Sequence, residues 1–218
     1  MLVLVSPRDL PVDELVGRAL ADGAAELAAG LPRLDVADRR GQRALDRWFA
    51  SWAEQLRAYL DAVSTVLVPV AADRGVLDAR WQQTIAADLA AIDHLVGALG
   101  DALGIVAMDL GDRAAWLDRA TSFAERLALL VRSQVSQHRR ISAVSRADLS
   151  AGERKAVDRG VVRLLGTWRA RHTVPSLLAH LQPAERQAVL AAAPATTSWW
   201  WRVARPQRVP LVGAATAA

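Results

Sequence analysis

The chain has 218 residues, enough to bury a substantial core, and we expect one domain with a terminal elaboration. It contains no cysteine, which excludes disulfides, thiolate nucleophiles and thiolate metal sites. Alanine, leucine, valine and arginine dominate, and glycine or proline falls mainly between periodic segments. This composition is typical of an all-α protein.

The formal net charge of +4 at pH 7 is unevenly distributed along the chain. Between Arg154 and Arg208, ten basic residues stand against two acidic ones, so the remainder is acidic on balance. Nearly all basic residues are arginine and no nucleic-acid-binding motif accompanies them, so we predict no nucleic-acid partner. The opening MLVLVSPRDL lacks a basic region, and no uninterrupted apolar stretch of roughly 20 residues follows. We therefore predict a cytoplasmic protein without a membrane span.

The first predicted helix covers Pro11 to Ala29. Its proline suits the first helical turn, and Asp13 and Glu14 complement the positive end of the helix dipole. Leucine and alanine recur at helical spacing behind them, and Gly30 ends the segment.

The second helix contains Leu45 to Val70, the most apolar periodic stretch of the chain. Its apolar residues recur three and four apart, which places them on one stripe. The stripe consists of Leu45, Trp48, Phe49, Trp52, Leu56, Tyr59, Val63, Val66, Leu67 and Val70. Asp35 or Asp38 can cap the helix, and Pro69 and the Asp73-Arg74-Gly75 turn are expected to stop it. We expect this stripe to form the centre of the core.

Two further long helices are predicted. The third covers Leu77 to Leu103, has Trp81 and Leu89 in its apolar stripe and is closed by Gly104; the fourth begins near Asp112. Four long helices with short connections pack antiparallel. We therefore predict an up-down-up-down four-helix bundle over residues 1–145.

Residues 146–218 are expected to form a helical extension packed on the bundle, with frayed last residues. Ser150 and Glu153 have the spacing of a capping box that starts a shorter helix. Short amphipathic pieces follow at 173–181 and 183–193. The triplet Trp199, Trp200 and Trp201 precedes several arginines. Packing on the bundle is the preferred interpretation of this triplet, and peripheral membrane contact is the alternative.

Several short motifs occur in a distinctive order: Trp48-Phe49, Leu67-Val68-Pro69, Leu149 to Glu153, Val174 to Leu178, Pro183 to Arg186 and Ala193-Pro194. In this order and spacing they resemble the bacterial hemerythrin-like family, also called the HHE cation-binding domain. The resemblance implies a four-helix bundle around two irons. It also implies a histidine and a glutamate four residues apart on the second helix, repeated on the fourth, so that each pair lies on one helix face.

The positions that hold metal in that family are occupied here by poor iron ligands. They fall on Tyr59 and Val63 of the second helix, Asp88 of the third, and Ser133 and Gln137 of the fourth, with His138 beside them. Valine cannot ligate, and serine, glutamine and un-ionised tyrosine are poor iron ligands. We therefore predict no di-iron centre and no cofactor. Any other ligand set would have to come from Asp61, Asp88, Asp93, His94 and His138.

The vacated metal cavity suggests a pocket for a small organic molecule, and we hypothesise cofactor-independent acid–base catalysis there. Asp88 or Asp61 would accept a proton and Tyr59 would donate one. The candidate ligand-binding residues are Trp52, Val63, Ser133, Gln137 and His138.

Other interpretations remain open. The polar residues could satisfy one another in a collapsed core, and helical periodicity also allows His94 and His138 a solvated face. The alternative functions are a non-catalytic structural or regulatory interaction protein and a residual iron- or oxygen-handling role.

Overall fold

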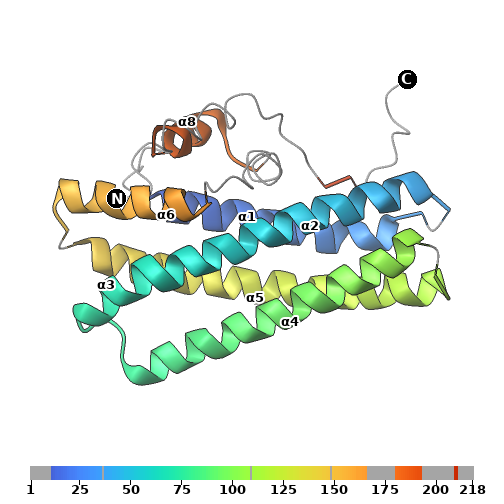
Figure 1. The fold of residues 1–218 in the computed structure, drawn as a ribbon, viewed down its shortest axis with the longest axis horizontal. Coiled ribbons are helices and arrows are strands. Elements are labelled where there is room, and N and C mark those ends of the chain that lie inside the picture. Colours follow the sequence, from blue (N-terminus) through green and yellow to red (C-terminus); the bar gives the residue numbers. More distant parts are fainter. Residues whose placement is uncertain are drawn as a thin grey trace, which may run out of the picture.

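A computed structural model describes residues 11–35, 37–108, 110–147, 149–165, 180–192 and 209–210. Within these ranges the regular structure is entirely helical, which confirms the predicted all-α class. The longest helices are α1 (Val12–Gly30), α2 (Arg39–Ala62), α4 (Ala79–Met108) and α5 (Arg113–Ala147). They lie side by side, and consecutive ones run in opposite directions (Figure 1).

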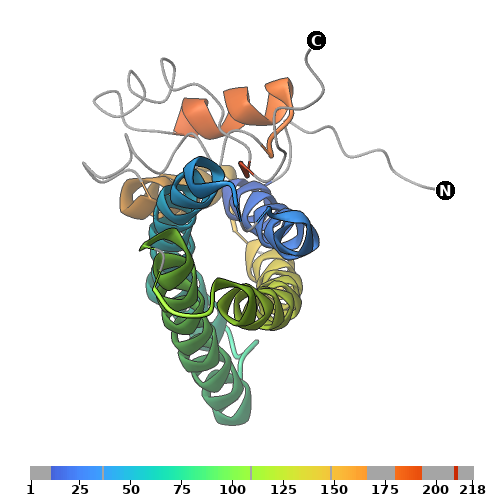
Figure 2. The same ribbon diagram turned by 90° about the vertical axis from the view of Figure 1, so that its right-hand side faces the viewer.

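These four helices form what we call the helical core. Helix α1 packs against α2 and α5, and α4 packs against the same two helices. Helices α2 and α5 therefore lie at opposite corners when the molecule is viewed from its end (Figure 2). Helices α2 and α5 run in the same direction. If a residue of α2 lies opposite a residue of α5, the residues four positions before each of them also lie at the same height in the core.

Helix α1 forms as expected, within one residue of each predicted end. Pro11 is its N-cap, and Asp13 and Glu14 occupy the first turn. A short 3₁₀ segment, η1 (Leu31–Arg33), follows it directly. The buried face of α1 includes Leu15, Val16, Ala19, Leu20, Ala24 and Leu27.

Helix α2 supplies the centre of the core, as its apolar stripe predicts. Its N-cap is Asp38, whose Oδ1 accepts hydrogen bonds from the backbone N–H groups of Arg40 and Gly41. Trp52 is only 1% exposed and stacks against Trp48 and Phe49, with ring centroids 6.1 and 5.8 Å apart. These rings bring a large apolar area into the core.

Of the two predicted stops of the second helix, the Asp73-Arg74-Gly75 turn is confirmed and Pro69 is wrong. Helix α2 passes into a π-helical segment, η2 (Val63–Leu67), and then into α3 (Val68–Asp73), which contains the proline. A proline has no N–H and its ring clashes with the carbonyl four residues earlier. The wider π turn shifts that carbonyl, so the chain accommodates Pro69 and continues to Gly75, whose φ of 68° makes the turn.

Helices α4 and α5 form with shifted ends. The carboxylate of Asp112 accepts a hydrogen bond from the backbone N–H of Ala115 at 3.1 Å, which confirms the predicted start of α5. Gly104 does not close α4; the turn occurs at Gly111, with φ of 70°. Trp81 is 41% exposed and does not join the core stripe, because the first turns of α4 project away from the other long helices (Figures 1 and 2).

Two shorter helices cover one side of the helical core. Helix α6 (Ala151–Leu165) contacts α1 and α2, and α8 (Pro183–Ala192) contacts α1 and α6. The predicted capping box is present, because Ser150 N–H donates to Glu153 Oε2 at 2.8 Å and Glu153 N–H donates to Ser150 Oγ at 3.3 Å. Most of the predicted segment 173–181 and the triplet Trp199, Trp200 and Trp201 lie outside the described residues. The domain boundary at 145 stays a prediction.

Candidate functional site

A tyrosine and a histidine meet inside the helical core. Tyr59 of α2 and His138 of α5 are each only 1% exposed, and their Oη and Nδ1 atoms lie 3.4 Å apart. The ring centroids are 5.8 Å apart. The two rings join the opposite corners of the core through a polar contact surrounded by apolar side chains.

Burial sets the protonation of both groups. Desolvation lowers the pKa of His138 from 6.5 to about 4, so its imidazole is neutral at pH 7. Desolvation, with smaller contributions from Asp13 and Glu14, raises the pKa of Tyr59 well above 10, so it remains a phenol. A phenol O–H that donates to Nδ1 leaves the proton of the neutral imidazole on Nε2. His138 then presents an N–H donor from Nε2.

One helical turn before this pair, two buried glutamines come from the same two helices. Gln55 precedes Tyr59 by four residues on α2, and Gln134 precedes His138 by four on α5; each glutamine is 1% exposed. A spacing of four puts each glutamine on the same face as its aromatic partner. Because α2 and α5 are parallel and Tyr59 meets His138, Gln55 and Gln134 lie at a similar level along the two helices. We refer to Gln55, Tyr59, Gln134 and His138 as the core polar site.

Gln134 is connected to a third helix. Its Nε2 amide donates a short hydrogen bond to the Oδ2 atom of Asp88 on α4, whose side chain is half-buried. This bond fixes the amide orientation, because a carboxylate can only accept. The carbonyl oxygen of Gln134 is consequently left as a free acceptor.

Four buried polar atoms of the core polar site have no hydrogen-bond partner among the described residues. They are both amide atoms of Gln55, Oε1 of Gln134 and Nε2 of His138. Leaving a buried donor or acceptor unsatisfied costs about 1–3 kcal/mol, and buried polar groups in native proteins are nearly always paired. These unpaired atoms lie on two helices, within one helical turn of the Tyr59–His138 contact.

A separate buried ionic cluster ties α6 to the core. Arg146 of α5 donates through Nη2 to Asp13 of α1 at 2.6 Å and to Asp158 of α6 at 2.8 Å, and its Nε donates to Ser142 Oγ at 2.9 Å. Desolvation raises the pKa of Asp13 from 3.8, and this effect exceeds the opposing attraction of Arg146. The cluster links three helices, and its polar groups are engaged with one another. It therefore has a structural role.

The structure places the sequence-predicted residues unequally. Trp52, Tyr59, Val63 and His138 are buried, Asp88 and Gln137 are half-buried, and Asp61, Ser133 and His94 are exposed. Ser133 is thus not an interior residue, and the interior register of α5 lies one position later, at Gln134 and His138. The expectation of a solvated His138 is also wrong. The family resemblance places Ser133 and Gln137 inside, whereas the apolar stripe of α5 places Gln134 and His138 there.

Three contributors were not predicted from the sequence. They are Gln55, Gln134 and Gly17, whose backbone lies against Tyr59. The apolar stripe of α5 has unbroken three- and four-residue spacing through Leu127, Val131, Gln134, His138 and Ile141. Continuing that stripe through its polar positions would have identified Gln134. Hydrophobic periodicity does not identify Gly17, because glycine has no side chain that would mark a buried face.

The residues present do not fit a di-iron centre. Within the described ranges, no three His, Asp or Glu side chains come together in a way that could hold a metal ion. The core polar site offers one imidazole, two amides and a phenol, whereas iron sites of this kind need several carboxylates and imidazoles. Neutral amides are weak ligands for iron.

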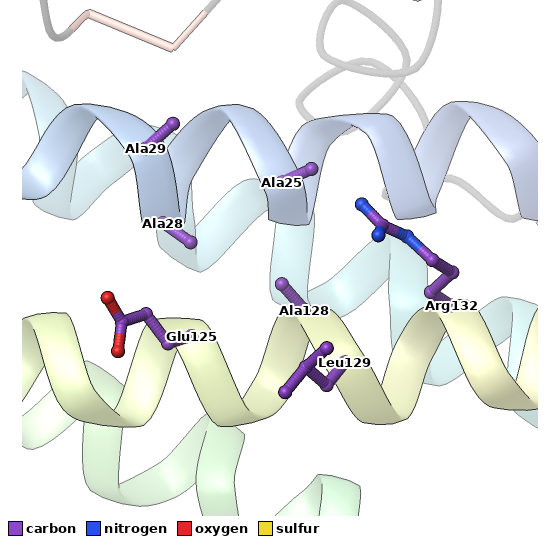
Figure 3. A pocket seen from close by; sticks show the side chains of 7 residues that line it. All are labelled: Ala25, Ala28, Ala29, Glu125, Ala128, Leu129 and Arg132. Atoms are coloured by element: carbon purple, nitrogen blue, oxygen red, sulfur yellow. The ribbon is translucent and has the colours of Figure 1, made fainter.

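A hollow lies on the outer face between α1 and α5. It has a volume of about 430 Å³ and is lined by Ala25, Ala28, Ala29, Glu125, Ala128, Leu129 and Arg132 (Figure 3). The alanines create it by leaving space between the helices, and Glu125 and Arg132 stand at its two ends. It differs from the core polar site in position and in chemistry.

Of the described helices, α4 is long and apolar enough to cross a membrane by length and composition. Only 39% of its most apolar window is buried inside the structure, and the buried side faces α2 and α5. The core helices of soluble proteins pass the same criterion. The predicted lack of a membrane span stays a prediction.

Comparisons of the chain with protein-family models, with curated proteins and with solved structures found no match.

Proposed function

We propose that the protein binds a small organic molecule at the core polar site, inside an up-down-up-down four-helix bundle of the hemerythrin-like kind that has no di-iron centre. The observation that carries this proposal is the group of unpaired polar atoms on Gln55, Gln134 and His138. Such atoms destabilise a core unless something pairs with them. A protein without a ligand for them would be more stable with leucine at these positions.

The spacing of the core polar site supports the resemblance. The pairs Gln55/Tyr59 and Gln134/His138 have the four-residue separation of the family's ligand pairs, and they lie on the second and fourth long helices. On α2 the pair lies four residues before the family positions assigned from the sequence, Tyr59 and Val63. On α5 it lies one residue after Ser133 and Gln137. Amides and aromatic groups would then stand where that family has its metal ligands.

The protonation states favour binding over acid–base catalysis. A general acid or base works best with a pKa near the operating pH. The pKa of Tyr59 lies well above 10 and that of His138 is about 4, so neither is suited to proton transfer at pH 7. Of the two proposed proton acceptors, Asp61 is exposed and Asp88 is half-buried and accepts a hydrogen bond from Gln134. We therefore favour a binding protein, with Tyr59 and His138 as recognition groups.

A fragment screen by thermal shift tests the proposed function. Fragments that enter the core should raise the melting temperature of the wild type and of Ser133→Ala, an exposed neighbour that serves as the control. They should have no effect on Gln134→Leu or Gln55→Leu, which remove the unpaired atoms. Fragments that stabilise all four proteins equally, or the lack of any stabilising fragment, would contradict a ligand site in the core.

A second candidate function is a non-catalytic protein interaction through the α1–α5 hollow. Leu129 lines this hollow and is 66% exposed, between Glu125 and Arg132. A large apolar side chain flanked by opposite charges is suited to a complementary surface. Sedimentation of the wild type and of Leu129→Asp tests for self-association. A dimer that the variant abolishes would favour this function, and a monomer at all concentrations would count against it.

A further inference from the structure

We propose that the ligand of the core polar site is an uncharged molecule that both donates and accepts hydrogen bonds, of the carboxamide class. This inference rests on the proposed function and names the chemistry of the ligand. It is argued from the charges and the unpaired polar atoms of the core polar site.

No residue of the core polar site carries a charge that a ligand could neutralise. Gln55 and Gln134 are amides, Tyr59 is a phenol, and His138 is a neutral imidazole at pH 7. An ion placed here would lose its hydration without gaining a counter-charge, which is strongly unfavourable.

The charged groups nearest the site are already engaged. Asp88 is half-buried and accepts from the Gln134 amide, and Asp13 and Asp158 are paired with Arg146. Glu14 is paired with Arg139 at 2.7 Å. An anionic ligand would be repelled by Asp88, and a cationic ligand would have to compete with Gln134 for it. An uncharged ligand avoids both costs.

The unpaired atoms require both a donor and an acceptor on the ligand. Gln134 Oε1 can only accept, so it needs a ligand N–H or O–H group. With the Tyr59 O–H assigned as the donor to Nδ1, the imidazole proton lies on His138 Nε2, which then needs a ligand acceptor. These two groups lie one turn apart on the same face of α5.

A primary carboxamide meets these requirements with few atoms. Its carbonyl can accept from His138 Nε2–H while its NH₂ group donates to Gln134 Oε1. A carboxylate lacks the donor, and an amidinium lacks the acceptor. Each would leave at least one of the buried protein atoms without a partner.

Three nearly isosteric probes separate charge from shape: acetamide, acetate and acetamidinium. Tyr59 is the chain's only tyrosine, so tyrosine labelled with ¹³C gives a single set of ring signals that reports directly on the core. At pH 7 we expect acetamide to shift these signals saturably, with a millimolar dissociation constant because the ligand is so small. Acetate and acetamidinium should bind at least tenfold more weakly. Ser133→Ala should behave like the wild type, and Gln134→Leu should lose the acetamide response.

The possible results separate this inference from the proposed function. Saturable binding of acetate or acetamidinium in preference to acetamide would keep a ligand site in the core and overturn the carboxamide class. A lack of response to all three probes, together with water-to-protein NOEs at His138 from a long-lived buried water, would assign the unpaired atoms to water and overturn both. An equal acetamide response in Gln134→Leu would also overturn the assignment, because the contact to Gln134 Oε1 would then not exist.

Discussion

Gly17 of α1 lies so close to Tyr59 that a Cβ at position 17 would be 2.5 Å from the phenolic Oη and 2.9 Å from Cζ. The same Cβ would approach Val135 Cγ1 to 3.2 Å. These separations are shorter than van der Waals contact, so a glycine is needed for α1 to cover the tyrosine. The first helix, which lacks a histidine, thus contributes to the core polar site by bringing its backbone close.

Replacement of Gly17 by alanine should destabilise the protein by about 1–3 kcal/mol, the usual cost of overpacking a core. The matched control is Gly97→Ala on α4, where an added Cβ meets nothing within 4 Å. There the higher helix propensity of alanine should stabilise the protein by about 0.5–1 kcal/mol. Urea unfolding monitored by circular dichroism measures both changes. If the two substitutions have the same sign, α1 does not pack on Tyr59 as closely as described.

His138 should make stability depend on pH in mildly acidic solution. Its pKa in the folded protein, about 4, is lower than its unfolded value of 6.5, so the unfolded chain binds the proton more readily. The contribution is complete above pH 6.5 and is lost progressively as the pH falls to about 4. A shift of this size corresponds to roughly 3 kcal/mol. The variant His138→Gln, which keeps an acceptor for Tyr59 but does not titrate, should lose this part of the pH dependence.

Histidine NMR supplies the independent check. The ring signals of His138 should not titrate between pH 7 and pH 5, since the folded pKa is about 4. A midpoint near 6.5 would show that the imidazole reaches solvent and that the core layer opens.

The Arg146 cluster predicts a large difference between two substitutions. Arg146→Met leaves the buried carboxylate of Asp13 without its counter-charge, so it should cost about 3–5 kcal/mol. Asp13→Asn should cost less, because Arg146 keeps Asp158 and the asparagine oxygen can still accept its hydrogen bond. Denaturant unfolding of both variants at pH 7 tests this order. An equal cost would mean that the loss of packing, and not the unpaired charge, dominates.

The pH dependence of Asp13 has the opposite sign to that of His138. Burial raises its folded pKa above 3.8, so the folded protein binds the proton more readily than the unfolded chain. Its contribution is complete below pH 3.8 and is lost as the pH rises through the folded pKa. The free energy of unfolding of the wild type minus that of Asp13→Asn should therefore increase as the pH falls from 7 towards 4. A difference that stays constant would mean that Asp13 remains ionised throughout.

The sequence predicts the helices well because their signals are local. The caps at Asp38 and Asp112, the capping box at Ser150 and the burial of Trp52 each depend on residues within a few positions of one another. The turn at Gly75 was predicted correctly, but Pro69 does not stop the helix, because the preceding turn widens into a π segment instead of breaking. The exposure of Trp81 likewise depends on where neighbouring helices end, which periodicity does not report.

The candidate site could be predicted only in part. Helical spacing predicts the height of the site in the core and the involvement of Tyr59 and His138. The choice between Ser133 and Gln134 depends on how α5 is rotated about its own axis. A polar side chain gives no hydrophobic signal to fix that rotation. The contacts of Gln134 with Asp88 and of Gly17 with Tyr59 join residues distant in sequence, so the chain alone cannot reveal them.

Asp88 and Gln134 permit the clearest test of the interior register. The Nε2 of Gln134 donates to the Asp88 carboxylate, and its Oε1 is unpaired. Asp88→Leu would leave the whole buried amide unsatisfied, so it should destabilise the protein by about 1–3 kcal/mol. Gln134→Leu removes that amide from the core and should cost less or stabilise. In a double-mutant cycle the doubly substituted protein should then be more stable than Asp88→Leu alone, because leucine at position 134 removes the amide that Asp88→Leu leaves unpaired. Additive effects, or a stabilising Asp88→Leu, would mean that the two side chains do not interact and that the buried face of α5 is not the one that carries Gln134.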